Sequence, residues 1–136
     1  MIGDGLMAIF GAPLPLQDHA VCAVLAALDM TAMIEQFNVD RRSAGKPEIR
    51  IGVGIATGDM VAGYTGTQDR ATYTCIGDAV NLAARLEAHT KLAQRAVLID
   101  GETRAALGQS LPVEALDDIV FKGKAAAVAV YAVNAG

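Results

Sequence analysis

The sequence contains little cysteine and no excess of positive charge, and both absences narrow the possible functions. Its two cysteines, Cys22 and Cys75, lie far apart, with no Cys-x-x-Cys pair and no histidine at metal-ligand spacing. Isolated thiols of this kind are typical of a reduced, cytoplasmic protein. The net charge is −4 and no basic run occurs, so nucleic acid and anionic membrane surfaces are not expected partners.

Long hydrophobic runs are scarce as well. The longest, around residues 21–30, is too short and too rich in alanine to predict a membrane span, and no signal-peptide pattern precedes it. We therefore expect no membrane contact within this chain and a cytoplasmic location, which leaves room for a membrane tether elsewhere in the full-length protein. With 53% hydrophobic residues in 136, the chain can form the core of one globular domain.

Residue patterns predict strands and helices of unequal length. A long helix is expected from an N-cap at Asp18 to about residue 42, with its buried stripe at Val21, Leu25, Leu28 and Ala32. A strand is expected at 49–56, where apolar residues alternate with a glycine-bearing face that invites close approach by a helix.

The remaining elements complete an α+β pattern. Further strands are expected at 6–10, 71–76, 97–99, 119–122 and 128–133, further helices from 78 and at 102–107, and a glycine-rich hairpin turn at 58–66. This order favours helices on one face of a mainly antiparallel sheet, without a second domain. Because residues 1–5 resemble a turn with no strand before it, we expect residues 1–136 to be the C-terminal part of a longer domain.

The most informative segment is 73–87, YTCIGDAVNLAARLE. It predicts a strand, a Gly-Asp turn capped by Asp78, and a helix that opens with Asn81 and Arg85. These two residues are four positions apart and therefore share one helix face. An amide and a guanidinium in the first turns of a helix suit a polyphosphate or a ribose, although an exposed polar pair is also common on helix surfaces.

Four segments in register resemble the class III nucleotidyl cyclases, and the resemblance covers almost the whole chain. They are 2–11 (IGDGLMAIFG), 51–58 (IGVGIATG), 76–81 (IGDAVN) with Arg85, and 121–124 (FKGK). The resemblance implies a ferredoxin-like sandwich of helices on a mainly antiparallel sheet, here N-terminally incomplete. It also implies a homodimer with shared active sites that converts ATP to cyclic AMP and pyrophosphate, with two Mg²⁺ or Mn²⁺ ions at each complete site.

The resemblance assigns roles to five residues. Asp4 matches a metal-binding aspartate, Asn81 the residue that orients the ribose, and Arg85 the one that stabilises the pentavalent phosphorus. Thr74 occupies the position that reads the purine and resembles the threonine branch of the adenylyl cyclases. Lys122 matches a lysine that contacts the terminal phosphates.

Simpler interpretations of three of these residues stay open. Asp4 also suits an Asp-Gly turn, Thr74 is an ordinary strand residue, and Lys122 with the weaker candidate Lys124 is consistent with solvated surface charge. The two histidines, His19 and His89, are expected to be structural or solvent-facing.

Two parts of the family's site have no counterpart in residues 1–136: the first metal aspartate and the adenine-selecting lysine. We therefore expect these residues alone to be inactive or nearly so, and upstream regulatory domains to accompany them. The alternatives are a degenerate cyclase-like module that binds nucleotide or regulates a partner, a ferredoxin-like interaction domain whose motifs arose by chance, and a guanylyl cyclase. Thr74 disfavours the last.

Overall fold

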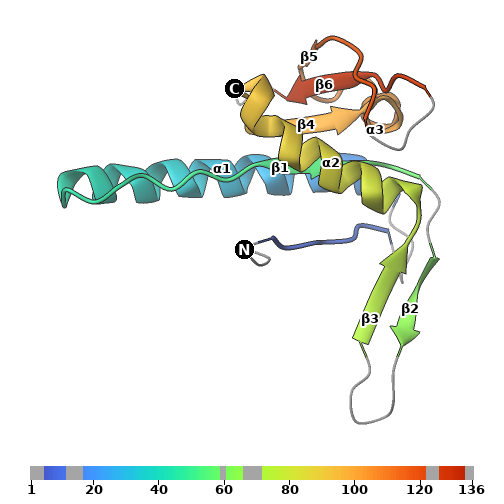
Figure 1. Ribbon diagram of the computed structural model, residues 1–136, viewed down its shortest axis with the longest axis horizontal. Coiled ribbons are helices and arrows are strands. Elements are labelled where there is room, and N and C mark those ends of the chain that lie inside the picture. Colours follow the sequence, from blue (N-terminus) through green and yellow to red (C-terminus); the bar gives the residue numbers. More distant parts are fainter. Residues whose placement is uncertain (1–4, 12–16, 59–60, 66–71, 122–125, 134–136) are drawn as a thin grey trace.

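In the residues that the computed structural model describes, the fold consists of a four-stranded sheet, a separate two-stranded ribbon and three helices (Figure 1). The structure describes residues 5–11, 17–58, 61–65, 72–121 and 126–133, with backbone only for 61–65 and 72–76. The larger sheet has the order β1-β4-β6-β5, in which β1 is parallel to β4 and the other neighbours are antiparallel. The elements are α1 (His19–Ser43), β1 (Val53–Ile55), β2 (Val61–Thr65), β3 (Thr72–Ile76), α2 (Asp78–Ala93), β4 (Val97–Asp100), α3 (Gly101–Leu107), β5 (Val113–Ala115) and β6 (Val130–Val133).

The predicted α+β class with a mainly antiparallel sheet is confirmed, but the helices cover both faces of the sheet rather than one. Strand β4 shows the division, because Val97 and Ile99 pack in a core cluster with α1 and α3. Leu98, between them, packs with Leu82 and Leu86 of α2 on the opposite face. Since β4 is apolar on both sides, it lies between two helical layers.

Helix α1 has almost the predicted bounds, but its buried face differs from the predicted one. The residues that face the core are Ala20, Val24 and Ala27, whereas Leu25 is 45% exposed. Val21 and Leu28 are partly buried at the margin of the core. Apolar residues occur all around this helix, so hydrophobic spacing alone does not define one stripe. Asp18 occupies the N-cap position without a side-chain capping hydrogen bond.

Much of the apolar surface of α1 lies outside the core. Met30, Met33 and Phe37 are exposed, and α1 is the one helix in the described residues that is long and apolar enough to cross a membrane by length and composition. The expectation that this chain has no membrane contact stays a prediction. Core helices of soluble proteins meet the same criterion, and Val24 is fully buried against the sheet.

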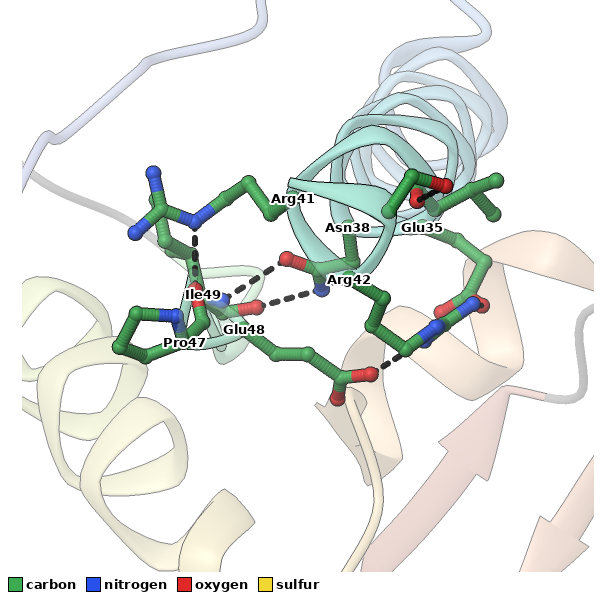
Figure 2. A network of polar contacts seen from close by, with 9 residues as sticks. Glu35, Asn38, Arg41, Arg42, Pro47, Glu48 and Ile49 are labelled. Carbon is green, nitrogen blue, oxygen red and sulfur yellow. Dashed lines mark hydrogen bonds and ion pairs between the residues drawn. The ribbon is translucent and has the colours of Figure 1, made fainter. Parts of the chain in front are cut away.

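Polar contacts attach the C-terminal end of α1 to the segment that leads into β1 (Figure 2). The side-chain amide of Asn38, which is 5% exposed, donates to the Ile49 carbonyl at 2.8 Å and accepts from the Ile49 N–H at 2.8 Å. Arg42 forms an ion pair with Glu48, whose hydrogen bond and charge raise the pKa of the guanidinium. These contacts fix the direction in which the chain enters β1.

Strand β1 is shorter than predicted, but its glycine face is packed as expected. A Cβ atom at Gly54 would lie 2.3 Å from the backbone oxygen of Ala83 and 2.4 Å from the backbone nitrogen of Glu87. Both atoms belong to α2, so this helix lies directly on the strand. At Gly52, just before β1, a Cβ atom would lie 2.1 Å from Oγ1 of Thr90, also in α2.

The glycine-rich segment predicted as a turn contains strand β2, which pairs with β3 to form an antiparallel ribbon that extends away from the larger sheet (Figure 1). Two other predictions need correction, and one strand was missed. Residues 6–10 do not form a strand, and Leu6 and Met7 are exposed. The predicted strand at 119–122 is represented by a single bridge between Ile119 and Val128. Strand β5 was not predicted at all.

Candidate functional site

Helix α2 positions Asn81 and Arg85 on the margin of its buried face. Leu82 and Leu86, the residues that directly follow them, are buried against the sheet, while Asn81 is exposed and Arg85 is half-buried. The Asn81 and Arg85 side chains therefore lie one helical turn apart, on a helix whose backbone is held by the buried leucines. The predicted sharing of one face is confirmed by the helix that the structure shows.

The first turn of α2 differs from the prediction in one respect. Gly77 is the N-cap, and Asp78, which was predicted to cap the helix, is the first helical residue. The Asn81 N–H instead bonds to the Gly77 carbonyl at 3.3 Å. An aspartate in the first turn still interacts favourably with the helix dipole, so the residue supports the helix without capping it.

Arg85 lines an open cavity of about 260 Å³ between α2 and the segment that follows β5. The other lining residues are Ala88, His89, Leu92 and Phe121. The rings of His89 and Phe121 meet edge to face, with centroids 5.9 Å apart and an interplanar angle of 89°. Phe121 directly precedes Lys122 in the chain. The cavity is therefore lined both by Arg85 and by Phe121, the first residue of the FKGK motif.

His89 and Phe121, which line this cavity, were not expected at the site from the sequence. His89 lies four residues after Arg85 and eight after Asn81, so its helical spacing was a signal that could have found it. Phe121 belongs to the FKGK motif, but its contact with α2 spans more than 30 residues of chain. Such a contact follows from tertiary structure and has no local pattern.

The segment that carries the first motif lies against the start of α2. Met7, Ala8 and Ile9 line a small cavity of about 60 Å³ together with Ala56 and three residues of the helix, Ala79, Val80 and Ala83. The chain that follows Asp4 is therefore packed beside the turn of α2 that carries Asn81. Asp4 itself lies outside the described residues.

The structure leaves the other predicted site residues less defined. Thr74 lies in β3, where its backbone pairs with Gly63 of β2, and this strand leads through Gly77 into α2. The description of β3 does not extend to its side chains. Lys122 and Lys124 lie outside the described residues, so the roles of Thr74 and the two lysines stay predictions.

A metal centre is not evident in the part of the chain that the structure describes. Within it, no group of three or more His, Cys, Asp or Glu side chains could hold a metal ion. Since Asp4 lies outside this part, its predicted role as a metal ligand also stays a prediction.

Comparisons with known proteins agree with the motifs and the fold. Residues 1–135 match the model of the adenylate and guanylate cyclase catalytic domain. The chain is 36% identical over 131 residues to adenylate cyclase 1 of Rhizobium meliloti. The aligned region covers 96% of this chain and 20% of that protein.

Two solved structures resemble the chain closely. The crystal structure of the guanylyl cyclase Cya2 has a TM-score of 0.81 and 30% identity, covering 91% of this chain and 62% of that one. The adenylyl cyclase CyaB from P. aeruginosa has a TM-score of 0.80 and 32% identity, covering 92% and 64%. The chain thus spans a fifth of the Rhizobium protein and less than two thirds of each solved chain. It belongs to the adenylate and guanylate cyclase catalytic-domain family.

Proposed function

We propose that this chain is part of an adenylyl cyclase that converts ATP to cyclic AMP and pyrophosphate. The observation that carries the proposal is the placement of Asn81 and Arg85 one turn apart at the margin of α2, on a helix anchored directly to β1 through Gly54. The segment that follows Asp4 packs beside the same helix. Asn81 and Arg85 thus lie on a helix whose first turns line a small cavity together with residues 7–9.

The proposed reaction is an intramolecular phosphoryl transfer. The ribose 3′ oxygen bonds to the α-phosphorus, the bond from that phosphorus to the pyrophosphate oxygen breaks to release pyrophosphate, and the hydroxyl proton passes to water. Asn81 has an amide that can donate to and accept from the ribose, which orients it. Arg85 is half-buried, so its fixed charge stabilises negative charge at the phosphorus more strongly than it would in water.

Divalent cations complete the proposed site. We propose that Asp4 provides a carboxylate ligand, a hard oxygen donor of the kind that Mg²⁺ and Mn²⁺ prefer. Such ions lower the pKa of an attacking hydroxyl and neutralise phosphate charge. This proposal rests on the sequence motif.

The choice of ATP over GTP rests on Thr74. A hydroxyl can accept a hydrogen bond from the adenine amino group or donate one to a ring nitrogen, and adenylate cyclase 1 of Rhizobium meliloti is a relative. The structural likeness to the guanylyl cyclase Cya2 makes GTP the second candidate substrate.

We further propose that the active protein is a homodimer with shared sites, as the family resemblance implies. We also propose that regulatory domains accompany this chain, because the Rhizobium relative is about five times as long as the matched region. Residues 1–136 contain no counterpart of the family's first metal aspartate or adenine-selecting lysine. By themselves they are therefore proposed to be inactive or nearly so.

The test is product formation by the complete protein as its gene encodes it. The purified protein is incubated with Mn²⁺ and ATP, with GTP in a parallel reaction, and the cyclic products are separated by chromatography. The proposal expects cyclic AMP to exceed cyclic GMP, and Asn81→Ala to abolish its formation. Lys91→Ala, an exposed change on the same helix, is the control that keeps activity. ATP binding without any cyclic product would support a regulatory, non-catalytic module instead.

A further inference from the structure

We propose that one side of α1 is a docking surface for an amphipathic helix from the part of the full-length protein that lies outside residues 1–136. The surface, here called the outer stripe, is formed by Ala26, Met30, Met33 and Phe37. This docking rests on the proposal that further domains accompany the chain, and it does not depend on catalysis.

The outer stripe follows the axis of α1 for about three turns. Its residues are separated by four, three and four positions, so they lie above one another on one side of the helix. Met30, Met33 and Phe37 are 44%, 71% and 48% exposed. Spacings that alternate between three and four are those by which one helix packs along another. The stripe therefore has the form of a helix-packing surface.

The described residues leave the C-terminal half of α1 almost uncovered. Ala20, Val24 and Ala27, which pack in the core, all lie in the N-terminal part of the helix. Beyond them only Asn38 is buried, and it bonds to Ile49. In Figure 1 this half of α1 extends beyond the four-stranded sheet, with the segment that leads into β1 beside it. Because helices in proteins gain most of their stability from packing of an apolar face, the exposed stripe indicates a partner outside the described residues.

The size of the outer stripe favours a partner in the same polypeptide over a second copy of the chain. From Ala26 to Phe37 the helix rises about 17 Å, and the stripe has four residues. A stable interface between separate chains buries about 1,200–2,000 Å² and uses about 20–30 residues on each side. A segment of the same polypeptide has a high effective concentration and loses less entropy on docking. A surface this small can therefore hold a covalently connected helix.

The relatives contain the additional polypeptide that such a helix requires. The matched region is a fifth of the Rhizobium protein. In the solved structures of Cya2 and CyaB, more than a third of each chain lies outside the region shared with this one. A docking helix therefore needs no separate protein.

Charges beside the outer stripe define the expected partner further. Asp29 precedes Met33 by four residues, and Asp40 follows Phe37 by three. Both carboxylates therefore lie beside the stripe, and both residues are exposed. The Arg41 guanidinium lies 5.6 Å from the centre of the Phe37 ring. A helix that covers the stripe should have apolar residues at the same spacing and Lys or Arg on the side that meets the two aspartates.

Methionine oxidation tests whether the outer stripe is covered in the complete protein. Hydrogen peroxide converts exposed methionine to the sulfoxide, and tandem mass spectrometry measures the rates at Met30 and Met33 in the native protein and in urea. Burial of a methionine corresponds to about a tenfold or larger change in an equilibrium constant. Both residues should therefore react at least about tenfold more slowly in the native protein, and this protection should persist on dilution.

Two results of this measurement would overturn the proposal. The first is a native rate at Met33 within about twofold of the rate in urea, because the stripe would then be uncovered. The second is protection that is lost on dilution, because a second copy would then be the occupant.

A pair of lysine substitutions tests whether the stripe itself holds the partner. Met33→Lys places a charge in the stripe and should raise the native oxidation rate of Met30 by about tenfold. Glu35→Lys is the matched control, because its side chain is 70% exposed and lies on the opposite side of the helix from Met33. It should leave the Met30 rate unchanged. An equal Met30 rate in the two variants would contradict docking at the stripe.

Photo-crosslinking identifies the occupant. A benzophenone amino acid replaces Met33 in the complete protein, and mass spectrometry identifies the peptide to which it attaches. The expected peptide belongs to the same polypeptide, lies outside residues 1–136 and has apolar residues at spacings of three and four. Attachment to residues 1–136 of another copy would overturn the proposal. These measurements need no substrate, so absence of cyclic product would reject the proposed function and leave them decisive.

Discussion

Replacing Gly54 by alanine tests how the sheet positions α2, the helix that carries Asn81 and Arg85. The added methyl carbon would lie 2.3 Å from the Ala83 carbonyl oxygen and 2.4 Å from the Glu87 nitrogen. Ordinary contacts of a Cβ atom begin at 3.4 Å, so α2 would have to move away from β1 by about 1 Å. Because both neighbours are backbone atoms of a regular helix, no rotamer change can relieve the overlap.

Gly54→Ala is expected to lower both the unfolding free energy and kcat. Overpacking in a well-packed core costs about 1–3 kcal/mol, occasionally more, and we expect Gly54→Ala to lose about 3 kcal/mol of unfolding free energy because the clash is with backbone. A movement of about 1 Å at a reacting centre can reduce the rate about 100-fold. Asn81 and Arg85 move with α2, so kcat should fall by about that factor even where the protein stays folded.

Urea unfolding and a cyclase assay measure the two effects separately. Gly101→Ala is the matched control, because its methyl carbon would lie 3.8 Å from the Cβ of Ala129, an ordinary contact. That variant should be unchanged or up to about 1 kcal/mol more stable, since alanine favours the helix. If Gly54→Ala were as stable and as active as Gly101→Ala, the conclusion that β1 sets the position of α2 would be refuted.

Three further substitutions probe the packing that supports the site. Gly52→Ala meets the side chain of Thr90 and should cost about 1–2 kcal/mol by urea unfolding, of which Thr90→Ala in the same protein should recover at least half. Asn38→Ala removes both hydrogen bonds to Ile49 and should cost about 1–3 kcal/mol, whereas Asn38→Asp keeps one acceptor and should cost less. Leu86→Ala empties a fully buried position under α2 and should cost about 2–5 kcal/mol.

Each of these predictions has a result that contradicts it. Equal stability of Gly52→Ala with and without Thr90→Ala would show that the helix backbone, not the side chain, opposes the methyl group. Asn38→Asp less stable than Asn38→Ala would show that charge at this site outweighs its hydrogen bonds. A cost below about 1 kcal/mol for Leu86→Ala would mean that α2 is less firmly packed than its burial indicates.

The parts of the fold that could be predicted from the sequence are those with a strong local pattern. The bounds of α1, the close packing on Gly52 and Gly54, and the helix that carries Asn81 and Arg85 all follow from spacing within one segment. The buried face of α1 could not be predicted because alanines and larger apolar residues surround the helix. In β4, the uninterrupted Val-Leu-Ile run was a signal for burial on both faces, and it was not used.

The candidate site shows a similar division. Asn81 and Arg85 share a helix, so their arrangement follows from their spacing. The contact between His89 and Phe121 joins α2 to a distant part of the chain, and its formation depends on how the sheet brings the segment after β5 against the helix. Sequence motifs identified both segments, and the fold was needed to show that they meet.

The central claim is that Arg85, held by α2, acts on the reaction itself rather than on substrate binding. The most direct measurement is the kcat and KM of Arg85→Ala in the complete protein with Mn²⁺ and ATP, beside Lys91→Ala. We predict that Arg85→Ala lowers kcat by about 100- to 1000-fold with KM changed by less than about threefold, while Lys91→Ala changes neither. A kcat for Arg85→Ala within about threefold of that of the unsubstituted protein would contradict the account.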